Sequence, residues 1–232
     1  MLFLLTALAV AAAPDTTKTA LTADVGFVNT AGNTSLTTFN FGNKFEATSP
    51  AWGFVQTFSS VIGSSEGETT TSLWRAAVRG DRNFSERVSL YVLSEFDRNR
   101  FAGISSRYGE SAGLAVKLVD SERTRLSAEA GAGYIWQNAT EPGQSSSFSA
   151  GRLAGILRQK LGERAEFSQT LELLPNFKAS DDLRINSETS LSAPIAAGIS
   201  MKASYTIRHD GLPEPGFEKT DRIFTTGVQV SF

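Results

Sequence analysis

The chain has 232 residues, of which 41% are hydrophobic and 20% charged, so it is neither a disordered chain nor a uniformly apolar one. A formal net charge of -2 gives no support for nucleic-acid binding, because such surfaces carry a basic excess. The absence of cysteine excludes a disulfide framework and cysteine-based zinc or redox sites.

The first predicted element is the apolar run over residues 2–13. It has the length of a signal-peptide hydrophobic region and is too short to span a bilayer as a helix. Ala9-Val10-Ala11 fits the small-residue cleavage pattern, so the sequence predicts a signal peptide over residues 1–11, with a cut as late as residue 13. A buried N-terminal helix is the alternative. Residues 12–232 show no linker or shift in composition, which indicates a single domain.

Beyond this leader the sequence alternates apolar and polar residues nearly to its end. Successive side chains of a strand point to opposite faces, so each alternating segment predicts a strand with one apolar and one polar face. The segments 52–61, 149–159 and 167–174 alternate less clearly than the others. The predicted strands cover 21–27, 39–46, 52–61, 74–79, 88–97, 111–118, 126–136, 149–159, 167–174, 184–191, 199–208 and 222–232.

The connections alternate between tight turns, such as TSPA and DSER, and longer loops, such as LPNFKASDD. This pattern, with an even strand number, is typical of an outer-membrane barrel whose termini are both periplasmic. A soluble barrel or sandwich also alternates, but strands in soluble sheets average about 5–6 residues, whereas the best strands here run roughly 9–12. The sequence therefore predicts an all-β fold, a transmembrane antiparallel up-and-down β-barrel of about 12 strands, preceded by a cleaved signal peptide.

Proline positions support these boundaries, because proline cannot donate a hydrogen bond to a ladder. We expect six prolines to fall between the strands: Pro50, Pro142, Pro175, Pro194, Pro213 and Pro215.

The chain ends in the strictly alternating segment TTGVQVSF. Its spacing resembles the insertion signal read by the outer-membrane barrel assembly machinery, which would pair with the strand edge. The terminal aromatic ring would then anchor at the membrane interface. A strand that closes a soluble sheet is the alternative. The four defined positions of the signal are filled by Thr225, Gly227, Val230 and Phe232.

Three segments, YVLSEFDRNRFAGISSRYGESAGLAVKL, LSAEAGAGYIW and PGFEKTDRIFTTGVQVSF, resemble the salt-induced outer-membrane protein family. The resemblance covers nearly all of the mature chain. It implies a location in the outer membrane of a Gram-negative cell and a connection with salt or osmotic stress. It implies no catalytic residues, because the family has no established activity.

Strand parity places many charged side chains in the lumen. A barrel of about twelve strands lies between side-chain-filled barrels and open porins, so two interpretations stay open. These charges either line a narrow pore or small-solute-binding barrel with a modest basic excess that favours anions, or pair across a plugged structural or envelope-stress barrel without transport. Inward Gly113, Gly131, Gly133, Ser200 and Ser204 would leave room for a solute. The lumen-lining candidates are Arg75, Arg79, Glu95, Asp97, Lys117, Glu129, Arg152, Arg158, Glu172, Arg184, Glu188, Lys202 and Arg208.

Little in the sequence points to catalysis. His209 is the single histidine, and an outer-membrane lipid hydrolase would need a nearby serine nucleophile that the spacing does not provide. The loop carboxylates Glu141, Asp181 and Asp182 lack the ligand spacing of a Ca²⁺ site. We therefore predict no enzyme activity, no cofactor and no metal.

The expected partners are the membrane, the assembly machinery and small ions or solutes, with no nucleic acid. Outward aromatic residues would form interfacial girdles, and outward Arg222 could meet lipopolysaccharide phosphates. The girdle candidates are Trp74, Tyr134, Trp136 and Tyr205.

Overall fold

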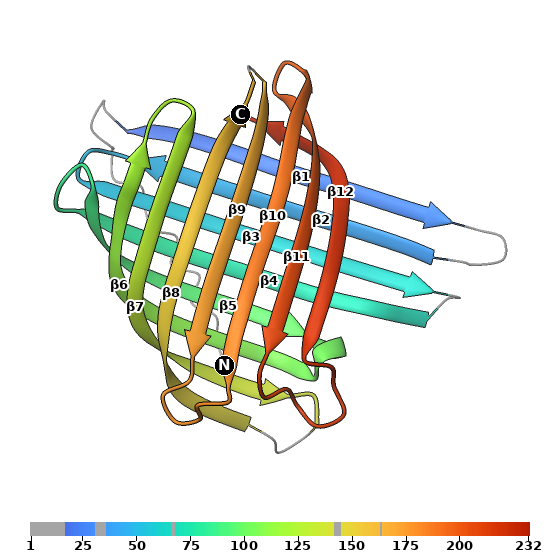
Figure 1. The fold of residues 1–232 in the computed structure, drawn as a ribbon. Helices are drawn as coiled ribbons and strands as arrows, with labels where there is room; N and C mark the ends of the chain where they lie inside the picture. The colour runs from blue at the N-terminus through green and yellow to red at the C-terminus, as the bar shows by residue number, and fades with distance from the viewer. Residues whose placement is uncertain (1–16, 31–35, 66–67, 142–144, 163) are drawn as a thin grey trace.

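The computed structural model describes residues 17–30, 36–65, 68–141, 145–162 and 164–232, which form a closed barrel of antiparallel strands (Figure 1). The predicted signal peptide and Pro142 lie outside the described residues. The strands are β1 (Lys18–Thr30), β2 (Leu36–Thr48), β3 (Trp52–Ser65), β4 (Glu68–Asn83), β5 (Val88–Asn99), β6 (Ile104–Asp120), β7 (Thr124–Ala139), β8 (Ser145–Leu161), β9 (Ala165–Pro175), β10 (Leu183–Ala196), β11 (Ile199–Asp210) and β12 (Thr220–Ser231).

Each strand pairs with its neighbours in the chain, and β12 pairs with β1 to close the ring. The prediction of a twelve-stranded up-and-down barrel is confirmed, and closure excludes the open sheets of a sandwich. The strands are longer than predicted, from 11 residues in β9 to 17 in β6 and β8. Their ends extend into serine- and threonine-rich sequence, where alternation is weak because both faces are polar.

Two prolines contradict the expectation that all of them lie between strands. Pro175 is the last residue of β9, and Pro194 lies inside β10. The register of β10 against β11 shifts between Pro194 and Ala196. Such an irregularity near a strand end accommodates a residue without a backbone N–H, which explains why β10 continues through it.

The two faces of the wall differ as the alternation predicts. Large apolar side chains stay exposed on the outer face, including the predicted girdle residues Trp74, Trp136 and Tyr205. Tyr134 is half-buried against Trp136, with 4.7 Å between ring centroids. Other exposed apolar residues are Val78, Leu90, Val92, Leu114, Leu118, Leu153, Leu171, Leu191, Met201, Phe224 and Val228. A continuous apolar exterior of this kind suits lipid contact.

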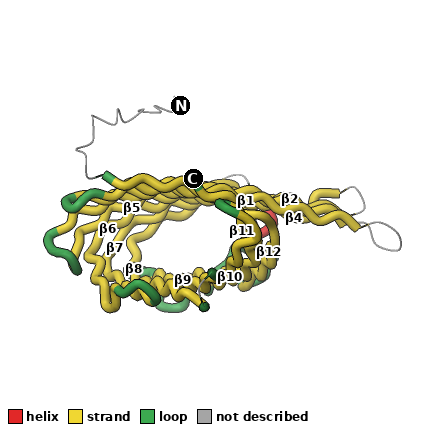
Figure 2. The backbone as a smooth tube through the Cα atoms, turned by 90° about the horizontal axis from the view of Figure 1, so that it is seen from above, coloured by secondary structure: helices red, strands yellow, loops and turns green. Residues whose placement is uncertain are grey.

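The seam between β1 and β12 is short. It holds four register pairs, from Thr22↔Ser231 to Val25↔Val228, whereas β1 and β2 pair along the whole of both strands. Seen from above, β1–β4 continue on one side beyond the ring (Figure 2). Gly227 allows the close approach at this seam, because a Cβ there would come within 2.3 Å of the Val25 carbonyl oxygen.

The chain has a loop end, which carries the β5–β6, β7–β8, β9–β10 and β11–β12 connections, and a turn end, which carries the β2–β3, β4–β5, β6–β7, β8–β9 and β10–β11 connections and Phe232. Among the described residues, no helix has the length and apolarity that crossing a membrane requires.

Candidate functional site

Inside the barrel, Arg152 on β8 joins two carboxylates from the neighbouring strands. Its Nη1 donates to Glu129 Oε2 on β7 at 2.6 Å, and its Nε donates to Glu172 Oε1 on β9 at 2.7 Å. All three side chains are more than nine-tenths buried. Charge-assisted bonds this short are among the stronger polar contacts in proteins, so this triad is a rigid centre.

Two arginines on β4 extend the triad across the lumen. Arg79 donates to Glu129 at 2.7 Å, and Arg75 donates to Glu95 at 2.9 Å. Arg75 also lies 3.8 Å from Glu172. Because β4 and β9 are not neighbours in the sheet, this last ion pair bridges the interior rather than the wall. We call Arg75, Arg79, Glu95, Glu129, Arg152 and Glu172 the central belt.

Tyr91 lies at the middle of the central belt and is 0% exposed. Its ring is covered by the guanidinium groups of Arg79 and Arg152, with 4.6 and 5.1 Å to the centroid. A Cβ at Gly113 or Gly131 would come within 2.8 or 2.5 Å of the Tyr91 hydroxyl oxygen. The expectation that these two glycines leave room for a solute is therefore wrong, because the tyrosine ring takes that space.

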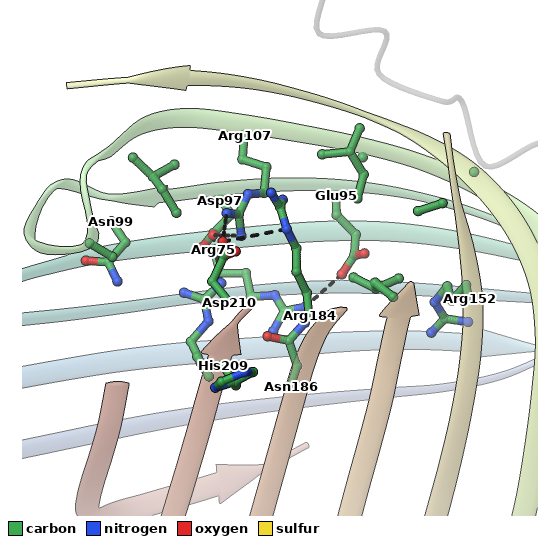
Figure 3. A pocket seen from close by; sticks show the side chains of 18 of the residues that line it. Arg75, Glu95, Asp97, Asn99, Arg107, Arg152, Arg184, Asn186, His209 and Asp210 are labelled. Atoms are coloured by element: carbon green, nitrogen blue, oxygen red, sulfur yellow. Dashed lines mark hydrogen bonds and ion pairs between the residues drawn. The ribbon is translucent and has the colours of Figure 1, made fainter. Parts of the chain in front are cut away.

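A second network lies toward the loop end (Figure 3). Arg208 on β11 donates to Asp97 on β5 at 2.7 Å, and Arg107 on β6 donates to Asp210 on β11 at 2.9 Å. Arg184 on β10 lies 3.6 Å from Asp210. The first two pairs join strands that are not neighbours, so they cross the lumen, whereas Arg184 and Asp210 face each other on the neighbouring strands β10 and β11. We call Asp97, Arg107, Asp182, Arg184, Arg208 and Asp210 the loop-end belt.

Two cavities meet at these belts. The smaller one, about 90 Å³, lies at the loop end. The larger one, about 480 Å³, lies between the central belt and the wall formed by β1–β3 and β9–β12, and we call it the chamber. The residues that line both cavities, and therefore separate them, are Arg75, Glu95, Arg152, Asn186 and Arg208.

The remaining lumen candidates lie outside both belts. Lys202 lines the chamber and lies 3.5 Å from Asp24, and Glu188 lines it as well. Lys117 is 56% exposed and pairs with Asp120 near the turn end. Arg158 is half-buried on β8 opposite Ser168 of β9.

The predicted basic excess does not extend to the belts. Every arginine of the two belts has a carboxylate within 4 Å, and Arg79 also pairs with Asp81. Sequence parity overlooked Asp182, which precedes β10, and Asp210, which ends β11. Asp210 continues the parity of Arg208 and could have been found; Asp182 lies in a loop, where alternation carries no information.

The residues considered for catalysis or Ca²⁺ have other surroundings. His209 Nδ1 lies 2.9 Å from Thr220 Oγ1, and its described contacts include no carboxylate and no serine. Asp182 accepts hydrogen bonds from Asn176 at 2.8 Å and Arg184 at 3.3 Å. The described part of the chain contains no cluster of three or more histidine or acidic side chains suited to a metal ion.

The four residues of the C-terminal pattern occupy both faces of β12. Thr225 and Gly227 line the chamber, while Val230 and Phe232 belong to the opposite face. Phe232 is 78% exposed, and its main chain exchanges hydrogen bonds of 2.8 and 3.2 Å with Leu21. The aromatic side chain is thus free of the fold while its backbone is held.

A closed antiparallel barrel with an apolar exterior and a charged, partly hollow interior defines a porin-like β-barrel protein. The chain belongs to the family described as "Protein of unknown function, DUF481", whose model matches residues 23–232.

Among solved structures, the NanC porin is 10% identical with a TM-score of 0.50, over 91% of this chain and 97% of that one. The KdgM porin is 9% identical with a TM-score of 0.50, over 93% of this chain and 99% of that one. At this identity the likeness concerns the fold. A search of curated protein sequences found no match.

Proposed function

We propose that this protein is an integral outer-membrane barrel that acts as a narrow pore or small-solute-binding barrel. One observation carries the proposal: two cavities lie in the same lumen and meet at a layer of side chains, with no strand or helix of the described chain between them. A side-chain layer can rearrange without unfolding the wall. The porin fold of NanC and KdgM supports this assignment.

Passage would require at least two ion pairs to open. Arg75–Glu172 closes the central belt across the lumen, and Asp97–Arg208 closes the loop-end belt. Rings of unpaired charge bias permeation toward one sign of ion. Because the belt charges are compensated, we expect weak selectivity between anions and cations, not the anion preference that strand parity predicted.

The same ion pairs support the second candidate, a plugged structural barrel without transport. Arg152 donates hydrogen bonds to both Glu129 and Glu172, and all three residues are buried. Opening the centre of the lumen would therefore require buried ion pairs to break. In that case the pairs serve to hold the wall together, and the loops carry whatever contacts the protein makes.

Single-channel conductance of the refolded protein in a planar bilayer separates the two candidates. We expect discrete openings for the wild type and a larger unitary conductance for Arg75→Ala/Arg208→Ala, because that change removes one lumen-crossing ion pair from each belt. Arg125→Ala, at an exposed turn-end residue, is the control and should conduct as the wild type does. A silent wild type with a conducting double variant favours the plugged barrel, and silence of all three overturns the pore.

Export and assembly are part of the proposal. We expect the assembly machinery to read Thr225, Gly227, Val230 and Phe232, so deletion of Phe232 should reduce heat-modifiable barrel in the outer-membrane fraction. Val228→Ala changes the same outer face of β12 outside the pattern and should assemble normally. Equal assembly of the deletion and the wild type would remove this role for Phe232.

Two further expectations concern contact with lipopolysaccharide and a connection with salt stress. Arg222 is exposed near the loop end of β12, where lipopolysaccharide phosphates would lie, and unchanged lipopolysaccharide binding by Arg222→Ala would contradict that contact. The resemblance to the salt-induced family implies a connection with salt or osmotic stress, which expression measured across external salt concentrations would test.

A further inference from the structure

The chamber has a wall of different chemistry from the belts. Along β1–β3, β9, β11 and β12, hydroxyls and amides without charge are the commonest of its inward side chains. Examples are Asn40, Thr57, Thr170, Thr206, Thr225 and Gln229, which come from five different strands around the ring. A solute in the chamber would therefore meet hydrogen-bonding groups from several directions.

These polar groups are not used by the fold. Within the part of the chain that the structure describes, none of these six side chains forms a hydrogen bond with another protein group. Hydroxyl and amide groups can both donate and accept, so they match a partner that does the same. Ordered groups that face a cavity and lack protein partners are typical of a binding surface.

The charges that line the chamber are, by contrast, mostly paired. Lys202 lies 3.5 Å from Asp24, Lys44 lies 2.6 Å from Glu46, and the arginines belong to the belts. Glu188 is the exception, since no described residue forms an ion pair with it. A chamber whose cations are compensated and whose unpaired charge is a carboxylate disfavours an anionic solute.

The chamber also offers an apolar patch beside its polar wall. Val61, Leu73 and Leu93 line it, and each is at most 9% exposed. Sugars and polyols present hydroxyl groups together with C–H surfaces, so this combination of surfaces suits them. A volume of about 480 Å³ lies within the range of small-molecule sites, roughly 300–1,000 Å³.

We propose that the chamber binds a neutral polyhydroxylated solute of about hexose size, held by the hydroxyl and amide wall with its C–H face on the apolar patch. This inference rests on the proposed function and names the solute class that the barrel would accept. Glu188 would accept a hydrogen bond from a solute hydroxyl, as a carboxylate without a protein partner can.

Binding by the refolded full chain in detergent micelles tests the proposal with three hexoses that differ in charge: glucose, glucuronate and glucosamine. Isothermal titration should show glucose binding and at least about tenfold weaker binding of glucuronate. Thr206→Val/Thr225→Val removes two hydroxyls at nearly constant shape and should weaken glucose binding about tenfold, because two neutral hydrogen bonds to the solute are lost. Thr19→Val is the matched control, because Thr19 is exposed on β1 with the parity of the outer-face residue Val25 and does not line the chamber.

Each outcome decides a different point. Glucuronate binding as tight as glucose binding overturns the neutral class, and so does preferred glucosamine binding that Glu188→Gln abolishes. Discrete channel openings without glucose binding, or an equal effect of Thr19→Val, overturn the chamber site while leaving the pore. Glucose binding by a barrel that stays silent in the bilayer supports the chamber site and overturns the open pore.

Discussion

At the scale of single residues, Arg152 shows how the lumen is organised. Its guanidinium bonds two buried carboxylates and covers the ring of Tyr91, three contacts that use its planar fork and its flat face together. Lysine carries the same charge but lacks the fork and the face. We therefore attribute the arrangement of Glu129 and Glu172 to the arginine at this position.

Replacing Arg152 by alanine should destabilise the barrel strongly, because Glu129 and Glu172 would remain buried with fewer partners. Breaking a buried ion pair costs about 3–5 kcal/mol, which urea unfolding in lipid vesicles would measure. Arg125→Ala is the control: Arg125 is 65% exposed and 4.0 Å from Asp120, so its loss should cost less than about 1 kcal/mol. Similar losses for the two variants would mean that the triad contributes no more than a surface contact.

At the scale of elements, the closing seam is the least extensive strand pairing of the barrel. Four register pairs join β1 to β12, and Gly227 allows the two backbones to approach. Parity and turn lengths predicted each strand, but they carried no information about how many residues would pair at closure. The offset between the first and last strands is a property of the ring as a whole.

A disulfide across the seam should stabilise the barrel. Leu21 and Phe232 exchange both main-chain hydrogen bonds, so the adjacent Thr22↔Ser231 pair is the closer, non-hydrogen-bonded kind, with Cα atoms about 4.5 Å apart. That separation lies within the range of disulfides. We expect oxidised Thr22→Cys/Ser231→Cys to resist urea unfolding by about 2–4 kcal/mol more than its reduced form.

The native chain has no cysteine, so the single variants Thr22→Cys and Ser231→Cys are clean controls. Neither should respond to reductant. If the oxidised double variant unfolds as the reduced one does, the cross-link does not stabilise the barrel, which contradicts the expected close pairing of Thr22 with Ser231.

At the scale of the whole molecule, the apolar exterior suits contact with lipid, and the proposed function places the outer face of the barrel in the membrane. Leu114, near the middle of β6, is 50% exposed on this face, and Leu118, near the turn end of the same strand, is 55% exposed. The two residues have similar exposure but different expected depth. Substitutions at these two positions therefore distinguish a membrane environment of the outer face from an aqueous one.

Leu114→Arg should destabilise the barrel in lipid vesicles by about 2–4 kcal/mol, the cost of arginine at the bilayer midplane, whereas Leu118→Arg near the interface should cost about 0–1 kcal/mol. Urea titrations of both variants in vesicles provide the measurement. An equal and small cost at the two positions would indicate that the outer face contacts water and not lipid.

Much of the fold and part of the site could be predicted from the sequence. Parity assigned Arg75, Arg152 and Glu172 to one face because the side-chain period of a strand is local. The same reasoning failed at Pro194, where a register shift lets a strand continue, and at Asp182, where no strand exists to give a parity. It also misjudged Gly113 and Gly131, because the ring that fills their space comes from β5.

The sequence by itself determined the strand number, the order of the strands and the two faces of the wall, since alternation and turn length are properties of neighbouring residues. Only the tertiary structure decided that Arg75 meets Glu172 across the lumen, that Tyr91 lies between two arginines, and that hydroxyl and amide side chains from several strands share the wall of one chamber. Partners on opposite walls depend on how the ring closes, because the tilt and stagger of all the strands together set which residues share a level.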